Sequence, residues 1–315
     1  MSVKQATNIK AICNRDALVE AMSLITGVVS GRTPTPSLQC VKISGHDGCL
    51  TLTATDGEVS LVLSIDQVDL EECGEVLVPA DKFSQIARSC DDSTLKIIGD
   101  DDKLNVRSSD SRFKVFGFPI SEAPQVRTFD DVEPDFSIDG SSFRGLMERT
   151  VFAAATDHSR YAINGVHIDL RDSTIRLVAT NGHRLALSTG PCDSNCEKID
   201  CIVPTKAMVL LKRLLHDGGG VVSVKINDGQ IIFHVDHEGG YTSTLTSNLV
   251  EGTFPPFEDV IPKDLDRKAV INKDAMHRVV RRAHLMTNEE SRGVQLIFND
   301  NTLTITSRAP ETGEA

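Results

Sequence analysis

Two hydrophobic spacings alternate along this chain and predict helices separated by strands. Leu18, Ala21, Met22 and Ile25 fall at i, i+3, i+4 and i+7, which predicts an amphipathic helix with one apolar face. The same spacing recurs at four other places. The predicted helices span residues 14–25, 79–90, 141–152, 204–215 and 272–285.

Between these helices apolar and polar residues alternate, which is typical of strands with one buried face. Val166, Ile168 and Leu170 take the apolar positions of one such segment. His167 and Asp169 fall between them and are expected on the polar face of a half-buried strand. Other strands are predicted at 175–177, 221–226, 231–235 and 241–245, and turns at 46–48 and 227–229.

The whole pattern repeats at an offset of 125 residues, because CVKISGHDGCLTLTATDG at 40–57 aligns with GVHIDLRDSTIRLVATNG at 165–182. A third copy, GVQLIFNDNTLTITSRAP, lies at 293–310. A fixed period indicates one structural unit used several times. Each unit is predicted to hold two helices and six to eight strands, an α+β domain with the helices on one face of antiparallel sheet.

A chain of 315 residues exceeds the usual size of one domain. The repeat predicts units at 1–130 and 131–258 and an incomplete third unit at 259–315. No apolar run is long enough to span a bilayer and the first ten residues do not resemble a leader, so a cytoplasmic protein is expected. Its eight cysteines are expected to be reduced.

Cys192, Cys196 and Cys201 lie near one another in the sequence but lack CxxC spacing and a second pair. Thiolate zinc sites need such paired spacing. Neither a metal site nor a cofactor is therefore predicted.

The charge is distributed unevenly along the chain. The five predicted helices together carry a formal charge of +7, so the remainder of a chain whose total is −12 carries −19. A basic helical surface on an otherwise acidic protein can hold a polyanion there and repel it elsewhere. The alternative for any one helix is an ordinary solvated face, but the bias recurs in four of the five.

No catalytic motif is present: the chain lacks a Gly-x-Ser-x-Gly elbow, a phosphate-binding loop and an HExxH pair. The repeat also argues against a shared catalytic acid, since Asp56 becomes Asn181 in the second copy and Ala309 in the third. A non-enzymatic protein is predicted. A hydrolase that uses His183 and Asp157 remains one alternative, and a non-replicative array that binds proteins remains another.

Several separated motifs resemble one family in the order in which they occur. They include TATDGE at 53–58, SRFKV at 111–115, SRYAINGVHI at 159–168, RLVATNGHRLAL at 176–187, IVPTKAM at 202–208, EGTFPPFEDVIP at 251–262 and SRGVQLIFNDNTLTIT at 291–306. Together with the repeat, they resemble the bacterial DNA sliding clamp, the β subunit of DNA polymerase III. The resemblance implies a processivity factor in which two chains of three similar domains close a ring around double-stranded DNA. In that ring the helices line the hole and the sheets form the outer wall.

The resemblance also implies functional positions. Arg32, Arg160, Tyr161 and Lys206 match residues that contact DNA without reading its sequence, while Ala162 departs from the pattern because an aromatic residue is common there. Phe113, Leu285 and Met286 match contacts between the two chains of the homodimer.

A pocket between the second and third domains takes short peptides from polymerase subunits, the clamp loader, ligase and repair proteins in this family. Its matching residues here are Ile163, Thr180, Gly182, His183, Arg184, Leu185, Pro255 and Val260. The family's last residues complete this pocket and the third domain. Because the third copy stops at Ala315, a C-terminally truncated form is expected, and its ring closure and peptide binding would be compromised.

Overall fold

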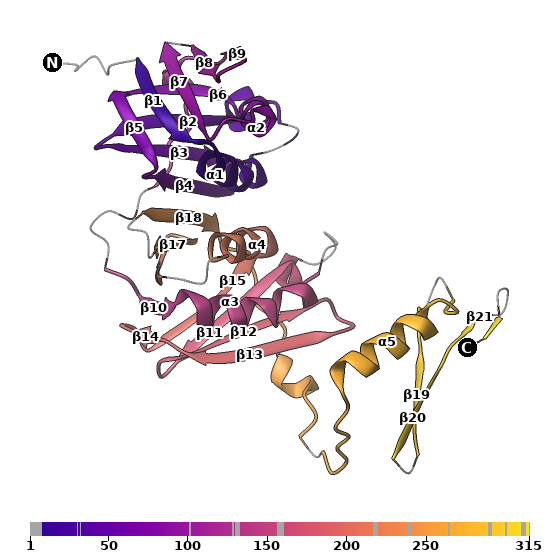
Figure 1. Ribbon diagram of the computed structural model, residues 1–315. Helices are drawn as coiled ribbons and strands as arrows, with labels where there is room; N and C mark the ends of the chain where they lie inside the picture. The colour runs from indigo at the N-terminus through magenta and orange to yellow at the C-terminus, as the bar shows by residue number, and fades with distance from the viewer. Residues whose placement is uncertain are drawn as a thin grey trace. The chain divides into compact units, whose positions relative to one another are not determined.

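The computed structural model describes residues 8–29, 31, 33–100, 102–127, 129, 133–155, 161–216, 220–237, 241–263, 265–288, 292–299, 301–309 and 313–314 (Figure 1). The chain divides into two compact units, Met1–Phe257 and Glu258–Ala315. Each unit is described by itself.

The first unit contains the repeat twice. Its first copy comprises β1 (Ile9–Asn14), α1 (Arg15–Val28), β2 (Cys40–His46), β3 (Cys49–Thr55), β4 (Val59–Ile65), β5 (Val68–Glu72), β6 (Gly74–Pro79), α2 (Ala80–Ser89), β7 (Thr94–Asp100), β8 (Lys103–Arg107) and β9 (Arg112–Phe116). Its second copy comprises β10 (Phe136–Asp139), α3 (Gly140–Glu148), β11 (Gly165–Arg171), β12 (Thr174–Thr180), β13 (Leu185–Pro191), β14 (Asp193–Ser194), β15 (Lys198–Pro204), α4 (Thr205–Leu214), β16 (Val221–Asn227), β17 (Gln230–Asp236) and β18 (Thr242–Asn248).

Within the residues that the structure describes, each copy therefore has two α-helices, as predicted, but nine strands rather than six to eight. Two short strands that were not predicted, one in each copy, explain the difference. β5 is a mostly exposed edge strand, and β14 has two residues. Val68 and Leu70 of β5 pack against the core, whereas β14 is defined by its pairing with β10.

One sheet runs through both copies, in the order β14-β10-β16-β17-β18-β4-β3-β2-β6. The copies join where β18 pairs antiparallel with β4, from Ser243 opposite Leu63 to Ser247 opposite Val59. The other two sheets, β5-β1-β7-β8-β9 and β13-β12-β11-β15, each belong to one copy. Backbone hydrogen bonds thus make the two repeats continuous.

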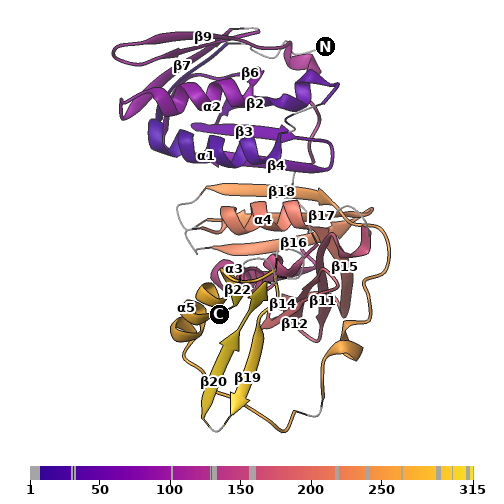
Figure 2. The same ribbon diagram turned by 90° about the vertical axis from the view of Figure 1, so that its right-hand side faces the viewer.

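The four helices of this unit form a layer beside the sheets (Figure 2). α1 contacts both α2 and α4, and α4 also contacts α3. Gly27 lets α1 approach α4 closely, because a Cβ atom there would lie 2.9 Å from Leu210 Cδ2. The predicted apolar face of α1, which includes Leu18 and Met22, is fully buried.

Side-chain caps explain where the first helix of each repeat begins. The Asn14 side chain accepts hydrogen bonds from the backbone N–H groups of Asp16 and Ala17, and Asp139 and Asn272 cap α3 and α5 (Lys273–His284) in the same way. Such caps satisfy N–H groups that have no partner inside the helix. The similar sequences NRDAL at 14–18 and NKDAM at 272–276 are therefore two copies of one helix start.

The predicted turns 46–48 and 227–229 are confirmed as tight hairpins. Asp47 and Gly48 have φ values of 48° and 75°, and Asp228 and Gly229 have 49° and 76°. Two successive positive φ values match the right-handed twist of the flanking strands. Aspartate and glycine are among the residues that adopt this conformation most readily.

One strand differs from its prediction. All residues of β11 from Gly165 to Leu170 are buried, including His167 and Asp169, which are 6% and 1% exposed. The apolar positions face the main core as expected. The polar face is covered by Phe254 and Phe257, so β11 is buried on both sides and not half-buried.

The second unit contains α5, β19 (Gln295–Asn299), β20 (Thr302–Thr306), β21 (Arg308–Ala309) and β22 (Gly313–Glu314). β19 and β20 form an antiparallel hairpin, and α5 packs against β20. The Ser307 hydroxyl donates a hydrogen bond of 2.6 Å to the Ala283 carbonyl at the end of the helix. The helix predicted at 272–285 is confirmed as α5, and the hairpin lies within the third copy of the repeat at 293–310. Within the described ranges, no helix has the length and apolar character that crossing a membrane requires.

Candidate functional site

The helix layer of the first unit is basic. The observed bounds of α1 to α4 enclose seven basic and four acidic side chains, a net formal charge of +3. Some of that charge is neutralised locally, since Arg144 pairs with Glu148 at 3.1 Å and Arg15 with Asp16 at 2.6 Å. Lys82 on α2 is exposed. The two ion pairs neutralise individual cations but leave the net charge of the layer at +3.

Lys206, a predicted DNA contact, lies at the joint between the repeats. Its Nζ donates to the Val28 carbonyl at 2.8 Å and to the Asp56 carboxylate at 2.5 Å, and its side chain is 42% exposed. Asp56 also accepts hydrogen bonds from the N–H groups of Glu58 and Val59. Burial, the largest effect, raises the pKa of Asp56, but Lys206 and the two N–H groups together lower it below its usual value.

The other predicted DNA contacts are only partly within the description. Arg32 and Arg160 lie outside the described residues, as does Asp157 of the hydrolase alternative. Tyr161 begins the short 3₁₀ helix Tyr161–Ile163, and its side chain lies outside the described part.

The predicted peptide pocket centres on the turn between β12 and β13. Thr180 Oγ1 accepts from the N–H of Gly182 at 3.1 Å and donates to the Arg184 carbonyl at 2.7 Å. Asn181 Oδ1 accepts from the N–H groups of His183 and Arg184, both at 3.1 Å. With Gly182 at a φ of 86°, this network turns the His183 and Arg184 side chains to the surface, where both are exposed.

Two contacts with Phe152 hold the Arg184 guanidinium beside this turn. Its guanidinium lies 5.6 Å from the ring centroid of Phe152 and donates to the Phe152 carbonyl. The Phe152 ring is 60% exposed although it is large and apolar. Cation–π contact and the carbonyl bond hold the cation at the surface, where it can meet an acceptor on a peptide.

The apolar pocket residues rest on a small separate core. This core lies on the face of the β11 sheet that does not pack on the main core, and Leu185 packs against it. It consists of Val178, Ile202, Phe254 and Phe257. Pro255 is exposed between the two buried phenylalanines. The structure thus brings Leu185 close to the segment that carries Pro255.

The two remaining pocket residues are placed differently. Ile163 is half-buried in the 3₁₀ helix, and its carbonyl accepts a hydrogen bond from the Ala155 N–H. Val260 belongs to the second unit and is 68% exposed.

The predicted contacts between two copies lie on separate elements. Phe113 is half-buried on β9, the last strand of its sheet among the described strands, and packs against the first repeat's core. Leu285 caps the C-terminus of α5 and is 78% exposed. Met286 follows it and is partly buried.

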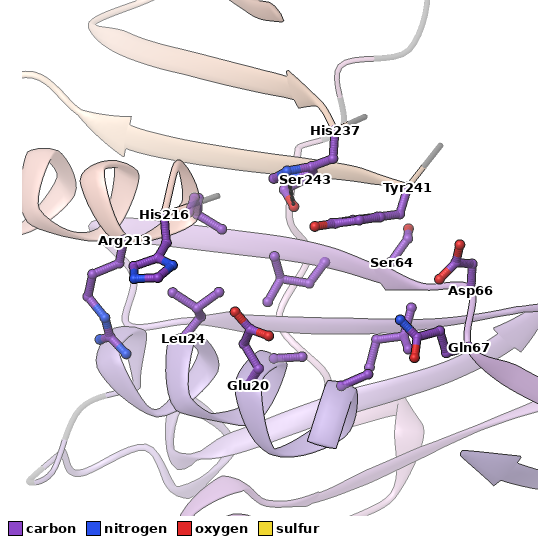
Figure 3. Close-up of a pocket in the computed structure, with 15 residues that line it drawn as sticks. Glu20, Leu24, Ser64, Asp66, Gln67, Arg213, His216, His237, Tyr241 and Ser243 are labelled. Carbon is purple, nitrogen blue, oxygen red and sulfur yellow. Dashed lines mark hydrogen bonds between the residues drawn. The ribbon is translucent and has the colours of Figure 1, made fainter. Parts of the chain in front are cut away.

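A cavity of about 200 Å³ lies at the joint between the repeats (Figure 3). α1 and β4 line one side of it, and β18 and the end of α4 line the other. Arg213 and His216 lie at one end in this view and Asp66 at the other, with Glu20 between them. Sequence patterns did not predict this cavity, because its lining comes from distant segments. Elsewhere too, the described residues contain no group of three or more His, Cys, Asp or Glu side chains able to hold a metal ion.

Comparison with known proteins identifies the family. Residues 9–127 match the N-terminal domain of the DNA polymerase III β subunit, 137–256 match its central domain and 258–315 match its C-terminal domain. The β sliding clamp of Salmonella typhimurium is 32% identical over 307 residues, which cover 97% of this chain and 82% of the relative.

Two solved structures support the same assignment. A sliding clamp from Pseudomonas aeruginosa bound to griselimycin is 33% identical, with a TM-score of 0.85 over 98% of this chain and 82% of that one. The clamp from Bartonella birtlesii, also bound to griselimycin, is 28% identical, with a TM-score of 0.87 over 98% of this chain and 82% of that one. The chain therefore belongs to the bacterial β sliding clamp family, the non-catalytic β subunit of DNA polymerase III, and is a processivity factor with the family's α+β fold of repeated clamp domains.

Proposed function

We propose that this chain acts in the cytoplasm as a homodimeric ring, each copy of which has repeats at 1–130 and 131–258 and an incomplete third at 259–315, with the helix layer facing duplex DNA. The observation that carries the proposal is the basic helix layer on a continuous sheet, in a chain whose total charge is −12. Backbone phosphates attract such a layer in any sequence context. A ring held in this way needs no base contacts.

Retention on DNA of different topology tests this proposal. The labelled chain is loaded onto a nicked circular plasmid by its cognate clamp loader, and the plasmid is then cut once. A ring stays on the circle and slides off the free ends of the linear form. Equal retention on both forms would favour the protein-binding array instead.

The internal repeat suggests how two copies join. β9 is the last strand of its sheet in the first copy, and β18 takes the equivalent place in the second copy, after β10, β16 and β17. β18 pairs with β4 of the first copy. An exposed strand edge presents unpaired N–H and C=O groups that another strand can bind. We infer that β9 pairs with the third repeat of a second copy, with Phe113, Leu285 and Met286 at that joint.

Sedimentation equilibrium tests the inferred joint. Phe113→Arg should weaken self-association at least tenfold, because it places a charge where the inferred joint would bury a half-buried apolar ring. Val221→Arg changes an apolar residue that is already 48% exposed in the second repeat and serves as the control. Unchanged association of Phe113→Arg would refute this joint.

We also propose that the surface of Thr180, Gly182, His183, Arg184, Leu185 and Pro255, with Ile163 and Val260, binds short peptides of the polymerase, clamp loader, ligase and repair proteins. Griselimycin, which is bound in two related structures, is proposed to bind this chain as well. Apolar walls beside a few fixed polar groups are typical of peptide and small-molecule sites.

Fluorescence anisotropy with overlapping labelled peptides that cover the polymerase III α subunit tests the peptide site. Arg184→Ala should weaken the tightest peptide about tenfold, the usual cost of one charge-assisted hydrogen bond. Arg127→Ala removes an exposed arginine that pairs with Asp228 and should leave binding unchanged. Equal affinity of the Arg184 variant and the unmodified chain would contradict the assignment.

A further inference from the structure

A row of polar and aromatic side chains fixes the segment that carries Pro255 to the outer face of the β11 sheet. The His167 ring stacks on Phe254 with the centroids 4.8 Å apart and the planes at 9°, and it meets Phe257 edge-on at 6.0 Å. Aromatic pairs in these arrangements add about 0.5–1.5 kcal/mol to the effect of area burial. Phe254 and Phe257 are each 7% exposed.

The strand register places His167 in this position. His167 lies opposite Val178 on one neighbouring strand and Ile202 on the other, so an apolar rim surrounds its ring. Its Nε2 lies 2.9 Å from Asp200 Oδ1. A carboxylate accepts there, so Nε2 donates, and the buried Nδ1 has no hydrogen-bond partner among the described residues. Hydrogen bonding from His167 is the main cause that lowers the pKa of Asp200.

The next row of the sheet supports the second phenylalanine. Asp169, 1% exposed, accepts from Arg176 Nε at 2.9 Å and from Arg171 Nε at 3.0 Å. This pairing fixes the Arg176 guanidinium, which lies 5.5 Å from the Phe257 ring centroid. A buried carboxylate is stable when such bonds satisfy it. The Asp169–Arg176 pair therefore holds a cation against Phe257.

The same cluster supports two walls of the peptide surface. Pro255 is exposed between the anchored Phe254 and Phe257, and Leu185 packs against the cluster from β13. The Val250 N–H donates to the Ile202 carbonyl at 2.9 Å and fixes the start of the segment. Phe254, Phe257 and Val250 are not among the residues proposed to contact the peptide.

We propose that His167, together with the Asp169–Arg176 pair, is a positioning residue for the peptide site: it anchors Phe254 and Phe257 and thereby sets the positions of Pro255 and Leu185. This inference rests on the proposed peptide function. A positioning residue acts through the groups it holds, so its loss weakens peptide binding without removing any peptide contact.

The test compares peptide affinity in matched variants, with the tightest labelled peptide of the α subunit as the probe. His167→Ala should weaken binding about tenfold. His167→Phe keeps a ring against Phe254 and should bind within about twofold of the unmodified chain. His234→Ala is the control, because His234 also stacks on a phenylalanine, Phe129, at 4.9 Å and pairs with an aspartate, but on β17. It should bind the peptide normally.

Two further measurements separate positioning from general damage. Hydrogen exchange should accelerate in residues 250–257 of His167→Ala and stay unchanged in α1. Retention on the nicked circle should be unchanged in all three variants. Phe254→Leu, a milder change of the partner ring, should also weaken the peptide, which keeps the inference testable if His167→Ala folds poorly.

The outcomes distinguish the two levels of the proposal. Equal peptide affinity of His167→Ala and the unmodified chain, or no recovery in His167→Phe, overturns the positioning role. Failure of the unmodified chain to bind any of the peptides overturns the proposed peptide function instead.

Discussion

The Lys206–Asp56 pair is expected to stabilise the joint between the two repeats of the first unit. Its two residues come from different repeats, and its distance of 2.5 Å is that of a direct charge-assisted hydrogen bond. Asp56→Asn removes the charge but retains an acceptor for the Glu58 and Val59 N–H groups, as Asn181 does in the second repeat. Lys206→Met removes the ammonium and keeps most of the stem.

The magnitude follows from the exposure of the two side chains. A hydrogen bond to a charged group contributes about 1.5–3 kcal/mol when it is well buried. An exposed ion pair contributes about 0.2–1 kcal/mol. Asp56 is 13% exposed and Lys206 is 42% exposed, so the pair lies between these limits, and we expect a coupling free energy of about 1 kcal/mol. The hydrogen bond from Lys206 to the Val28 carbonyl is lost both in Lys206→Met and in the double variant, so its free energy cancels in the double-mutant cycle.

A double-mutant cycle in urea unfolding measures this coupling. The pKa of Asp56 is lowered in the folded protein, so the contribution is present above the unfolded pKa of about 4 and is lost as the pH falls through the folded value. The coupling should therefore be full at pH 7 and decline below pH 4. A coupling below about 0.3 kcal/mol at pH 7, or one that persists unchanged into acid, would refute the reasoning.

Three other outcomes are expected. Phe233→Ala should lower the free energy of unfolding by about 3–5 kcal/mol, since the ring is fully buried 6.2 Å from Phe143; a loss below 1 kcal/mol in urea melts would contradict this packing. Gly182→Ala should cost about 1–2 kcal/mol in the same assay because φ is 86°, whereas Gly31→Ala, with equal open space and no positive φ, should cost much less. In thiol labelling with Ellman's reagent at pH 8, the exposed Cys73 should react at once, and Cys13, whose pKa burial raises to about 12, only on unfolding; early loss of both thiols would contradict the burial of Cys13.

Local periodicity was sufficient to predict the helices, because each buries one stripe of side chains that recurs within its own sequence. The ends of the helices were predicted less accurately. The helix predicted at 141–152 stops at Glu148, and Val151–Ala153 forms a separate 3₁₀ turn. Strand β5 was not predicted because its residues are mostly exposed and its place depends on pairing with β1. Repeat alignment could not supply either detail, since both depend on tertiary contacts.

The buried polar face of β11 shows the limit of sequence reasoning most clearly. His167 and Asp169 alternate with apolar residues as solvent-facing residues do, and only Phe254 and Phe257, more than eighty residues later, reverse that expectation. A clue was present: two phenylalanines flank a Pro-Pro pair in a segment with little other apolar character. Large apolar residues in such a segment often anchor it to a surface. The lining of the joint cavity carried no comparable signal.

The turn after β3 and the turn after β12 share one hydrogen-bond pattern but differ at one side chain. Thr55 and Thr180 make the same bonds across the turn. Asp56 and Asn181 each accept hydrogen bonds from two backbone N–H groups. They differ in the second side-chain group: the free oxygen of Asp56 binds Lys206, whereas Asn181 has a neutral amide there. A carboxylate at 181 would place a negative charge beside Arg184 and compete with peptide acceptors for it. The neutral residue adds no negative charge beside Arg184, and the acidic one pairs with Lys206 at the joint, so a single side-chain group separates the turn proposed to bind peptides from a structural one.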